Sequence, residues 1–445
     1  MRLTSILGGQ GPSRRAAGPG LGPSLLAAVF VLAQGLPPWA LAADTVPAAL
    51  GTPRHVPGST RRLAQLTGDY DPEGLPHHNL TTPWGVEGAD LGANTEHEGR
   101  LFIFFGDVPQ RQTGRNWPPH DADLIAYVNN RTNNPGSGAG SPRTIERGEI
   151  RLVPVLRDGL FHPFTEAEGI PGSNETPTGA FSHGGRAYVF VVKGNAKPYS
   201  VLTSSRDPAS PAAFQRHFVW SDTSPGSGRF WQVAPWVLHN AEVPGLPAKQ
   251  GDGVVLFGHG RARSGFGVHL AWLPLWAGRE PLRSELRYYT GEPASPWSAL
   301  EADAATLFHT KFAWTALSVG RIPTLGQWLL VSQRTSPNGA LDEHIVARMA
   351  GQPWAVGRAA EVSIFDPVRD GALGKYIYRA DLPDPNGLRD RPPRIGHPGF
   401  AYGAFLLNGY TQWDPRDATL TLYFLMSTGW PYQVQLMTTR IAFRE

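Results

Sequence analysis

The chain has 445 residues, which is enough to bury a large core in one big β domain or in two or three smaller domains. Its 52 glycines and 42 prolines exclude an architecture of long helices, and its 14 tryptophans, 12 tyrosines and 20 phenylalanines exclude a disordered chain. It has no cysteine, which excludes disulfides, thiol catalysis and cysteine-ligated metals.

The first 42 residues have the three parts of a secretory signal peptide. Arg14 and Arg15 provide the positive region, an apolar run follows at 25–36, and Ala40–Ala42 forms a small-x-small cleavage site. Cleavage would leave Ala43 first in a protein that is secreted, periplasmic or held in the cell envelope. The arginine pair also fits twin-arginine export, although Ala-Ala-Gly follows it.

Charge and hydropathy exclude two classes of partner. The formal charge of +3 comes from the three arginines of residues 1–42, so the rest of the chain has a net charge of 0. The apolar run of the signal peptide is too short for a membrane span. We therefore expect neither a nucleic acid partner nor a membrane span.

A loosely repeated pattern fills most of the chain. Residues 43–65, rich in Ala, Pro, Thr and Arg, are predicted to be a flexible lead-in, and residues 66–445 a single domain. Each copy of the pattern has a polar or Gly/Pro turn, an apolar strand, a short turn and a second apolar strand. The copies lie at 88–130, 175–207, 236–275, 311–351 and 399–443.

Five such units predict an all-β protein, a five-bladed β-propeller of four-stranded antiparallel blades. Radial repetition leaves few exposed edges among many short strands. A large β-sandwich and two separate β domains are the alternatives. Comparable segments before the strong strands, such as Thr-Gly-Ala-Phe at 178–181 and Trp-Thr-Ala-Leu at 314–317, favour the propeller.

The loops that lead into the innermost strands of a propeller converge on one face, so their residues form the candidate binding site. Aromatic rings stack on sugar faces and charged groups hydrogen-bond sugar hydroxyls, so these residue types predict a carbohydrate site. The candidates are Asp90, Glu175, Trp236, Glu242, Lys311, Trp314, His397 and Tyr402.

Asp90 and Asp107 are the candidate catalytic pair. They stand 17 residues apart with one turn between them, so they can return to the same end of one hairpin. Two carboxylates beside a glycosidic bond can divide the chemistry: one protonates the leaving oxygen, and the other activates water or attacks the sugar. Taken singly, each residue also fits a turn, an Asx-turn at Asp90 and a Gly-Asp turn at Asp107.

The sequence has no strong metal or cofactor motif. His77-His78 and His-Asp-Ala-Asp at 120–123 contain metal-ligand types without a metal-binding spacing, and we expect both to lie in solvated loops. Gly-x-Ser-x-Gly, P-loop, dinucleotide-binding and His-Glu-x-x-His motifs are missing. We expect no cofactor and no metal other than a structural calcium ion, and we expect a monomer.

The segments around both aspartates resemble the opening of the domain-of-unknown-function 4185 (DUF4185) family. There, Gly-x-Asp-Leu-Gly leads through a short turn to an apolar strand that ends in Phe-Gly-Asp, and the corresponding segments here are Gly88–Gly92 and Phe105–Asp107. Further matches are at 203–208, 311–320 and 426–441, so the likeness covers most of the predicted domain.

The resemblance implies a five-bladed propeller. It also implies an activity, because some members of this family belong to glycoside hydrolase family 183, endo-acting D-arabinanases that cut the arabinan of mycobacterial cell walls. It would make Asp90 and Asp107 the catalytic carboxylates. The sequence departs from the family pattern at Ala89, at Val108 and in a long insertion at 129–174, and these departures bear on the substrate more than on the fold.

We therefore predict a secreted glycoside hydrolase that acts on an arabinofuranose-containing polysaccharide, similar to an endo-D-arabinanase. The candidates other than the two aspartates would bind the substrate or tune the carboxylates. The alternatives are a non-catalytic carbohydrate- or protein-binding propeller of the cell envelope, and a glycosidase or lyase that acts on another polymer.

Overall fold

The computed structural model describes residues 50–75, 77–108, 122–128, 145, 148–157, 159–161, 175–193, 199–210, 214–260, 267–310, 316–334, 343–391 and 399–444. For Ala122, Arg157 and Glu175 it describes the backbone alone. These residues belong to one compact unit, Val46–Glu445. None of the helices in the described ranges has the length and apolar composition that crossing a membrane requires.

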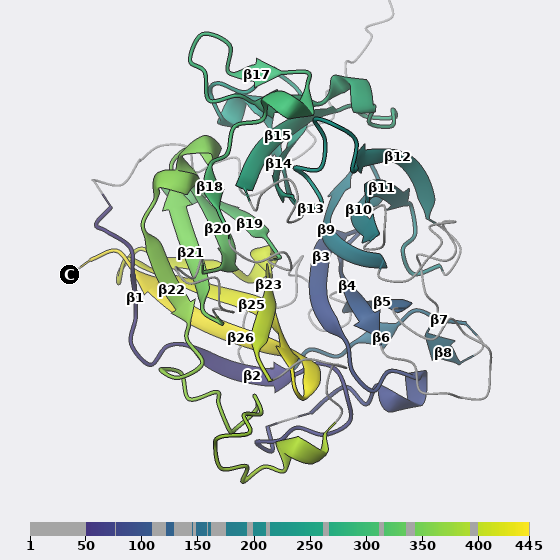
Figure 1. Ribbon diagram of the computed structural model, residues 1–445, viewed down its shortest axis with the longest axis vertical. Coiled ribbons are helices and arrows are strands. Elements are labelled where there is room, and N and C mark those ends of the chain that lie inside the picture. The colour runs from purple at the N-terminus through teal and green to yellow at the C-terminus, as the bar shows by residue number, and fades with distance from the viewer. Residues whose placement is uncertain are drawn as a thin grey trace, which may run out of the picture. The chain divides into compact units, whose positions relative to one another are not determined.

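The fold is all-β, a five-bladed β-propeller of four-stranded antiparallel blades (Figure 1). The predicted fold class is confirmed, and the sandwich and two-domain alternatives are wrong. Two of the blades also carry extra short strands beyond the basic four.

In blades 1 to 4 the strands of each blade follow one another along the chain. Blade 1 contains β3 (Asp90–His97), β4 (Arg100–Val108), β5 (Ala122–Val128) and β6 (Val153–Pro154). Blade 2 contains β9 (Glu175–His183), β10 (Arg186–Lys193), β11 (Tyr199–Ser205) and β12 (Gln215–Ser221). Blade 3 contains β13 (Gln232–His239), β14 (Asp252–His259), β15 (Gly267–Leu275), β16 (Arg287–Tyr289), β17 (Trp297–Ser298) and β18 (Phe308–His309).

Blade 4 contains β19 (Ser318–Ile322), β20 (Gln327–Gln333), β21 (Ile345–Ala350) and β22 (Glu361–Phe365). Blade 5 contains β23 (Ala401–Leu406), β24 (Gln412–Asp414), β25 (Thr419–Gly429) and β26 (Tyr432–Ala442), together with β1 (Arg54–His55) and β2 (Arg61–Gln65). A separate hairpin is formed by β7 (Leu156–Arg157) and β8 (Leu160–Phe161). Short 3₁₀ helices lie at η2 (Thr82–Trp84), η3 (Asn240–Glu242), η5 (Arg283–Glu285), η6 (Glu301–Asp303), η7 (Pro323–Leu325), η8 (Pro353–Arg358), η9 (Leu388–Asp390) and η10 (Asn408–Tyr410).

The five inner strands form a closed ring. β3, β9, β13, β19 and β23 lie next to one another in that order around the centre, and β23 lies beside β3 (Figure 1). They run in the same direction, since Asp90 contacts Tyr402 near the beginnings of two strands and His97 contacts Ser182 near the ends of two strands. We call the end at which these strands begin the N-terminal rim, and the opposite end the C-terminal rim.

Strands from both ends of the described chain complete blade 5. β1 and β2 pair antiparallel with β26, the last strand (Figure 1). The structure thus differs from the flexible lead-in predicted at 43–65, because Arg54–His55 and Arg61–Gln65 belong to the propeller. The outer edge of β26 would otherwise present unpaired N–H and C=O groups, and the N-terminal strands cover it.

The middle strands are apolar on both faces because each blade is covered by its neighbours. Phe102, Ile103, Phe104 and Phe105 of β4 are all buried and belong to one apolar cluster with residues of blades 2 and 5. A strand with two buried faces reads as a continuous apolar run and not as an alternating one. This accounts for the run Leu-Phe-Ile-Phe-Phe that precedes Gly106.

Candidate active site

The two candidate aspartates lie together at the N-terminal rim of blade 1. Asp90 is the first residue of β3 and pairs with Gly106 of β4, so Asp107 follows directly on the neighbouring strand. The single turn in the sequence between them predicts this arrangement. The two carboxylates therefore belong to one hairpin and one end of the propeller.

The Asp90 carboxylate is buried and is held from the neighbouring blade. Asp90 is 1% exposed, and its Oδ2 accepts a 2.7 Å hydrogen bond from the hydroxyl of Tyr402 on β23. An O–H donor stabilises the ionised form of a carboxylate. Gly106 makes room for this side chain, because a Cβ atom at position 106 would lie 3.1 Å from Asp90 Oδ1.

Asp107 is half-buried, and two other blades hold it. Thr176 of β9 donates its hydroxyl to Asp107 Oδ1 at 3.3 Å, and Tyr432 of β26 donates its hydroxyl to the Asp107 carbonyl oxygen at 2.9 Å. Blade 2 therefore positions the side chain and blade 5 positions the backbone. Of the two aspartates, Asp107 is the more exposed to a ligand at the rim.

The backbone beside both carboxylates is strained. Among the described residues other than glycine, four have a positive φ, and two of these are Leu91 at 62° and Asp107 at 46°. The pairing register shifts at both places, between Leu91 and Ala93 on β3 and between Phe105 and Val108 on β4. Such strain costs about 1–3 kcal/mol per residue and is concentrated at functional sites.

A third buried carboxylate lies on the next strand of the same blade. Asp123 is 0% exposed and lies on β5 opposite the part of β4 that carries Asp107. The expectation of a solvated loop at 120–123 is wrong for this residue, because β5 begins at Ala122 and takes Asp123 into the blade. Three adjacent strands thus each bring a carboxylate to the same rim.

The predicted binding residues have mixed outcomes. Tyr402 lies at the site as expected, bonded to Asp90 and packed on the Phe400 ring with 4.8 Å between centroids. Glu175 begins β9, so its backbone lies at the same rim, one residue before Thr176. Three further candidates, Lys311, Trp314 and His397, lie outside the described residues.

Trp236 and Glu242 do not lie at the N-terminal rim. β13 begins before Trp236, which is half-buried against an apolar cluster of blades 3 and 4, and Glu242 follows the strand at the C-terminal rim. The Glu242 carboxylate forms a salt bridge with Arg321. The prediction of a loop leading into a strand here is wrong because β13 continues through Pro235, which an inner edge strand tolerates.

Sequence reasoning missed three contributors to the site. Tyr432 ends the segment Gly-Trp-Pro-Tyr, a turn signal between two apolar strands that could have located it at this rim. Gly106 is the glycine of Phe-Gly-Asp, where a close approach of another side chain requires the missing Cβ. Asp123 directly precedes the apolar run Leu-Ile-Ala of the second predicted strand in the first copy, and its place at the start of that strand could have located it at this rim.

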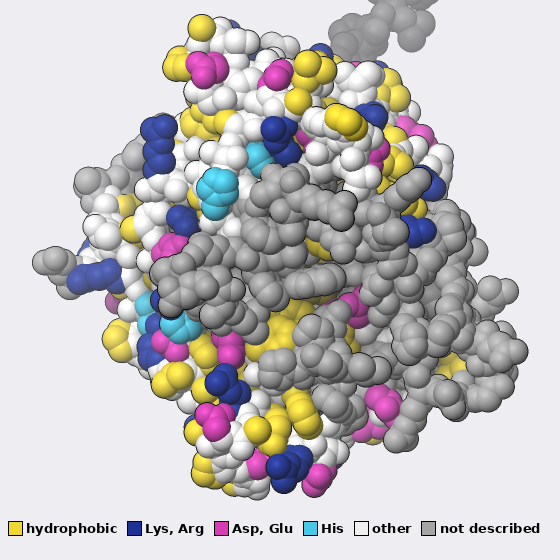
Figure 2. Space-filling model, in the orientation of Figure 1, with side chains coloured by type: hydrophobic (Ala, Val, Ile, Leu, Met, Phe, Trp, Pro, Cys, Tyr) yellow, Lys and Arg dark blue, Asp and Glu magenta, His cyan; other side chains and the backbone are white. Residues whose placement is uncertain are grey.

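No metal centre is visible in the described ranges, where no three His, Asp or Glu side chains are grouped to hold an ion. His77 Nε2 lies 2.8 Å from the Gly68 carbonyl oxygen, a contact that requires an N–H at this nitrogen. The predicted calcium ion stays a prediction. On the face that Figure 2 shows, positive and negative side chains are interspersed over the described part, in agreement with the near-neutral charge of the chain.

A family model described as "Domain of unknown function (DUF4185)" matches residues 77–438, most of the chain, which confirms the resemblance read from the sequence. No curated protein matches the chain.

Several solved structures are similar in fold. A glycosyl hydrolase from Bacteroides ovatus is 11% identical, with 91% of this chain and 95% of that chain covered and a TM-score of 0.41. The β-xylosidase/α-arabinofuranosidase CoXyl43 from a compost microbial metagenome is 11% identical, with 87% and 95% covered and a TM-score of 0.40. The α-L-arabinofuranosidase PaAbf62A from Podospora anserina is 9% identical, with 86% and 98% covered and a TM-score of 0.39.

Proposed function

This chain belongs to the DUF4185 family, and we propose that it is a secreted glycoside hydrolase that cleaves an arabinofuranose-containing polysaccharide with Asp90 and Asp107. The observation that carries the proposal is the pairing of these two carboxylates at one rim of the propeller. One is buried and hydrogen-bonded, the other is more exposed, and the backbone beside both is strained.

The environments of the two aspartates suggest different roles. Asp90, which the Tyr402 hydroxyl holds on the innermost strand, would attack the anomeric carbon or activate the water that does. Asp107, which reaches the rim, would give its proton to the leaving glycosidic oxygen and take one back from water in a later step. Thr176 and Tyr432 would keep Asp107 in position while this happens.

The substrate class rests on the resemblance of the Gly88–Gly92 and Phe105–Asp107 segments to the DUF4185 family, of which some members are endo-D-arabinanases, together with the position of Asp90 and Asp107 within these segments. The export route rests on the signal-peptide pattern of residues 1–42. N-terminal sequencing of the exported protein would test that part, with Ala43 as the expected first residue.

The decisive experiment is to incubate the protein with a panel of polysaccharides that includes mycobacterial arabinogalactan and to measure the oligosaccharides released. We expect release from the arabinan, and loss of release in Asp90→Asn and in Asp107→Asn with unchanged unfolding temperatures. Asp252→Asn is the matched control, because Asp252 is a partly exposed carboxylate that bonds His183 near the C-terminal rim. Full activity in both site variants would overturn the assignment.

A non-catalytic binding propeller makes a different prediction in the same experiment. It would retain a polysaccharide from the panel on an affinity gel and release no oligosaccharide from it. Hydrolysis of another polymer by the wild-type protein, lost in the same two variants, would keep the site and change the substrate.

A further inference from the structure

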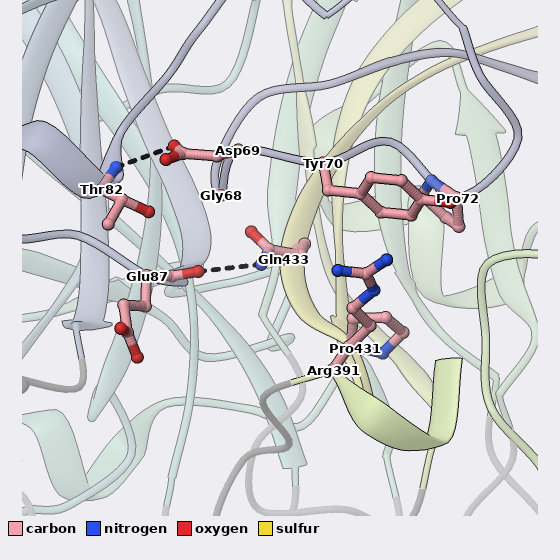
Figure 3. A pocket seen from close by; sticks show the side chains of 9 residues that line it. All are labelled: Gly68, Asp69, Tyr70, Pro72, Thr82, Glu87, Arg391, Pro431 and Gln433. Atoms are coloured by element: carbon pink, nitrogen blue, oxygen red, sulfur yellow. Dashed lines mark hydrogen bonds between the residues drawn. The ribbon is translucent and has the colours of Figure 1, made fainter. Parts of the chain in front are cut away.

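A cavity of about 170 Å³ opens beside the candidate active site, between four segments of the chain (Figure 3). Asp69 and Tyr70 come from the loop after β2, and Glu87 from the segment before β3. Pro431 lies in the β25–β26 turn, Gln433 is the second residue of β26, and Arg391 follows η9. At about 30 Å³ per water molecule, the cavity holds roughly six waters. This is room for a single sugar ring and not for a polymer segment.

The cavity and the two aspartates share their walls. Tyr432 lies between Pro431 and Gln433 and donates its hydroxyl to the Asp107 carbonyl oxygen. Since neighbouring residues of a strand point to opposite sides, Tyr432 faces Asp107 and Gln433 faces the cavity on the other side of β26. The two sides meet at the N-terminal rim, where β26 begins at Tyr432. Glu87 precedes Asp90 by only three residues. A polymer that passes the aspartates therefore has this cavity within reach.

The cavity is built by specific contacts. Gln433 donates its side-chain amide to the Glu87 carbonyl oxygen at 2.9 Å. Asp69 Oδ1 accepts the Thr82 N–H at 2.9 Å. The Arg391 guanidinium lies 3.6 Å from the centre of the Tyr70 ring, an arrangement that Figure 3 shows directly. These contacts fix the side chains before a ligand arrives, which lowers the entropy cost of binding.

The groups on the cavity wall define the class of ligand. Asp69 and Glu87 together outweigh Arg391, so the wall disfavours an anion, and a neutral ligand meets no charge repulsion. Carboxylates accept hydrogen bonds from vicinal hydroxyl groups, which a sugar ring presents. Arg391 Nε is buried and meets no acceptor in the described part of the chain, so its N–H can donate to a ligand. Tyr70 is 46% exposed and offers an aromatic face.

We propose that this cavity is a sugar-binding subsite, which holds one residue of the polysaccharide chain beside the linkage that Asp90 and Asp107 cleave. The inference rests on the proposed glycosidase function. It adds the residues that would position the polysaccharide chain relative to Asp90 and Asp107. Tyr70 packs against the sugar ring, Arg391 donates to its oxygens, and Asp69 accepts from its hydroxyl groups.

The test measures binding with turnover suppressed. Full-length protein carrying Asp107→Asn is titrated calorimetrically with arabinofuranosyl oligosaccharides of increasing length, alone and combined with Tyr70→Ala or Arg391→Gln. We expect each added change to weaken binding of the longer oligosaccharides roughly tenfold, equivalent to about 1.4 kcal/mol. Trp276→Ala is the matched control, since Trp276 is an aromatic residue of blade 3 with a similar exposed fraction, 49%, and no part in the cavity.

The outcomes separate the subsite from the catalytic proposal. Hydrolysis by the wild-type protein together with unchanged oligosaccharide binding in Tyr70→Ala and Arg391→Gln would overturn the subsite and leave the glycosidase standing. The absence of hydrolysis, with glycan binding that still depends on Tyr70 and Arg391, would overturn the glycosidase and keep the cavity as a sugar-binding site without a cleaved linkage beside it. Unfolding temperatures identify a variant that weakens binding by misfolding, and the second variant then decides.

Discussion

A buried ion pair holds the loop that carries one wall of the cavity. Arg62 of β2 makes two parallel hydrogen bonds to Asp71, each 2.7 Å long, and both side chains are 2% exposed. Asp71 Oδ1 also accepts the backbone N–H groups of Glu73 and Leu75, at 2.9 and 3.2 Å. The Arg62–Asp71 pair thus links β2, which completes blade 5, to the loop that carries Tyr70. Loss of the pair is expected to destabilise both β2 and this loop.

The expected cost follows from burial. Asp71→Ala leaves the Arg62 guanidinium buried with the partly exposed Glu73 as its remaining acidic partner, and breaking such a buried pair costs about 3–5 kcal/mol. At about 2 °C per kcal/mol for a large domain, the midpoint of thermal unfolding falls by about 6–10 °C. Replacing both residues together, as in Arg62→Met with Asp71→Leu, leaves no buried charge without its partner. This double variant is expected to lose less free energy of unfolding than Asp71→Ala alone.

The chain supplies a control that differs in burial. Arg279 and Glu285 form a pair at 2.6 Å whose side chains are 45% and 25% exposed. Glu285→Ala is expected to cost at most about 1 kcal/mol, because solvent screens an exposed pair. Thermal unfolding followed by tryptophan fluorescence compares the variants with the wild-type protein. Equal losses in Asp71→Ala and Glu285→Ala would refute the argument that burial decides the value of the Arg62 pair.

Three further predictions concern the site and the core. Tyr402→Phe removes the hydroxyl that donates to Asp90 and is expected to lower kcat/KM roughly 10- to 100-fold with the fold intact, as steady-state kinetics and circular dichroism would show. Gly106→Ala places a Cβ 3.1 Å from Asp90 Oδ1, and the displaced carboxylate is expected to lower kcat about tenfold without loss of substrate binding. Burial lowers the pKa of His269 from 6.5 to about 4. Between pH 6.5 and 4 the unfolded chain binds a proton that folded His269 does not, so the free energy of unfolding falls by about 3 kcal/mol as the pH drops from 6.5 towards 4. Urea unfolding of His269→Gln over this pH range should lack this loss.

The architecture of this protein could be predicted from the sequence because each blade repeats the same local signals. Apolar runs bounded by turns mark β4, β10, β14, β20 and β25, and the ring follows from their number. The part at Arg54–Gln65 could not be predicted, since β1 and β2 are short and polar. They form strands only because β26 offers them an open edge on which to pair.

The site was harder to predict because its contacts join distant parts of the chain. Asp90 and Asp107 were accessible to sequence reasoning since one turn separates them. The donor to Asp90 lies 312 residues away at Tyr402, and the donor to the Asp107 backbone lies 325 residues away at Tyr432. Trp236 was misplaced because a proline within an inner strand imitates a turn.

These long separations have a consequence for how activity depends on folding. Both aspartates belong to blade 1, but two of the hydroxyls that hold them, those of Tyr402 and Tyr432, come from blade 5, which is complete only after β1 and β2 pair with β26. A partly folded chain with an open ring could contain the Asp90–Asp107 hairpin and would still lack these two contacts. Catalytic geometry and ring closure should therefore be lost together, and substitutions that weaken closure should lower activity before they unfold the other blades.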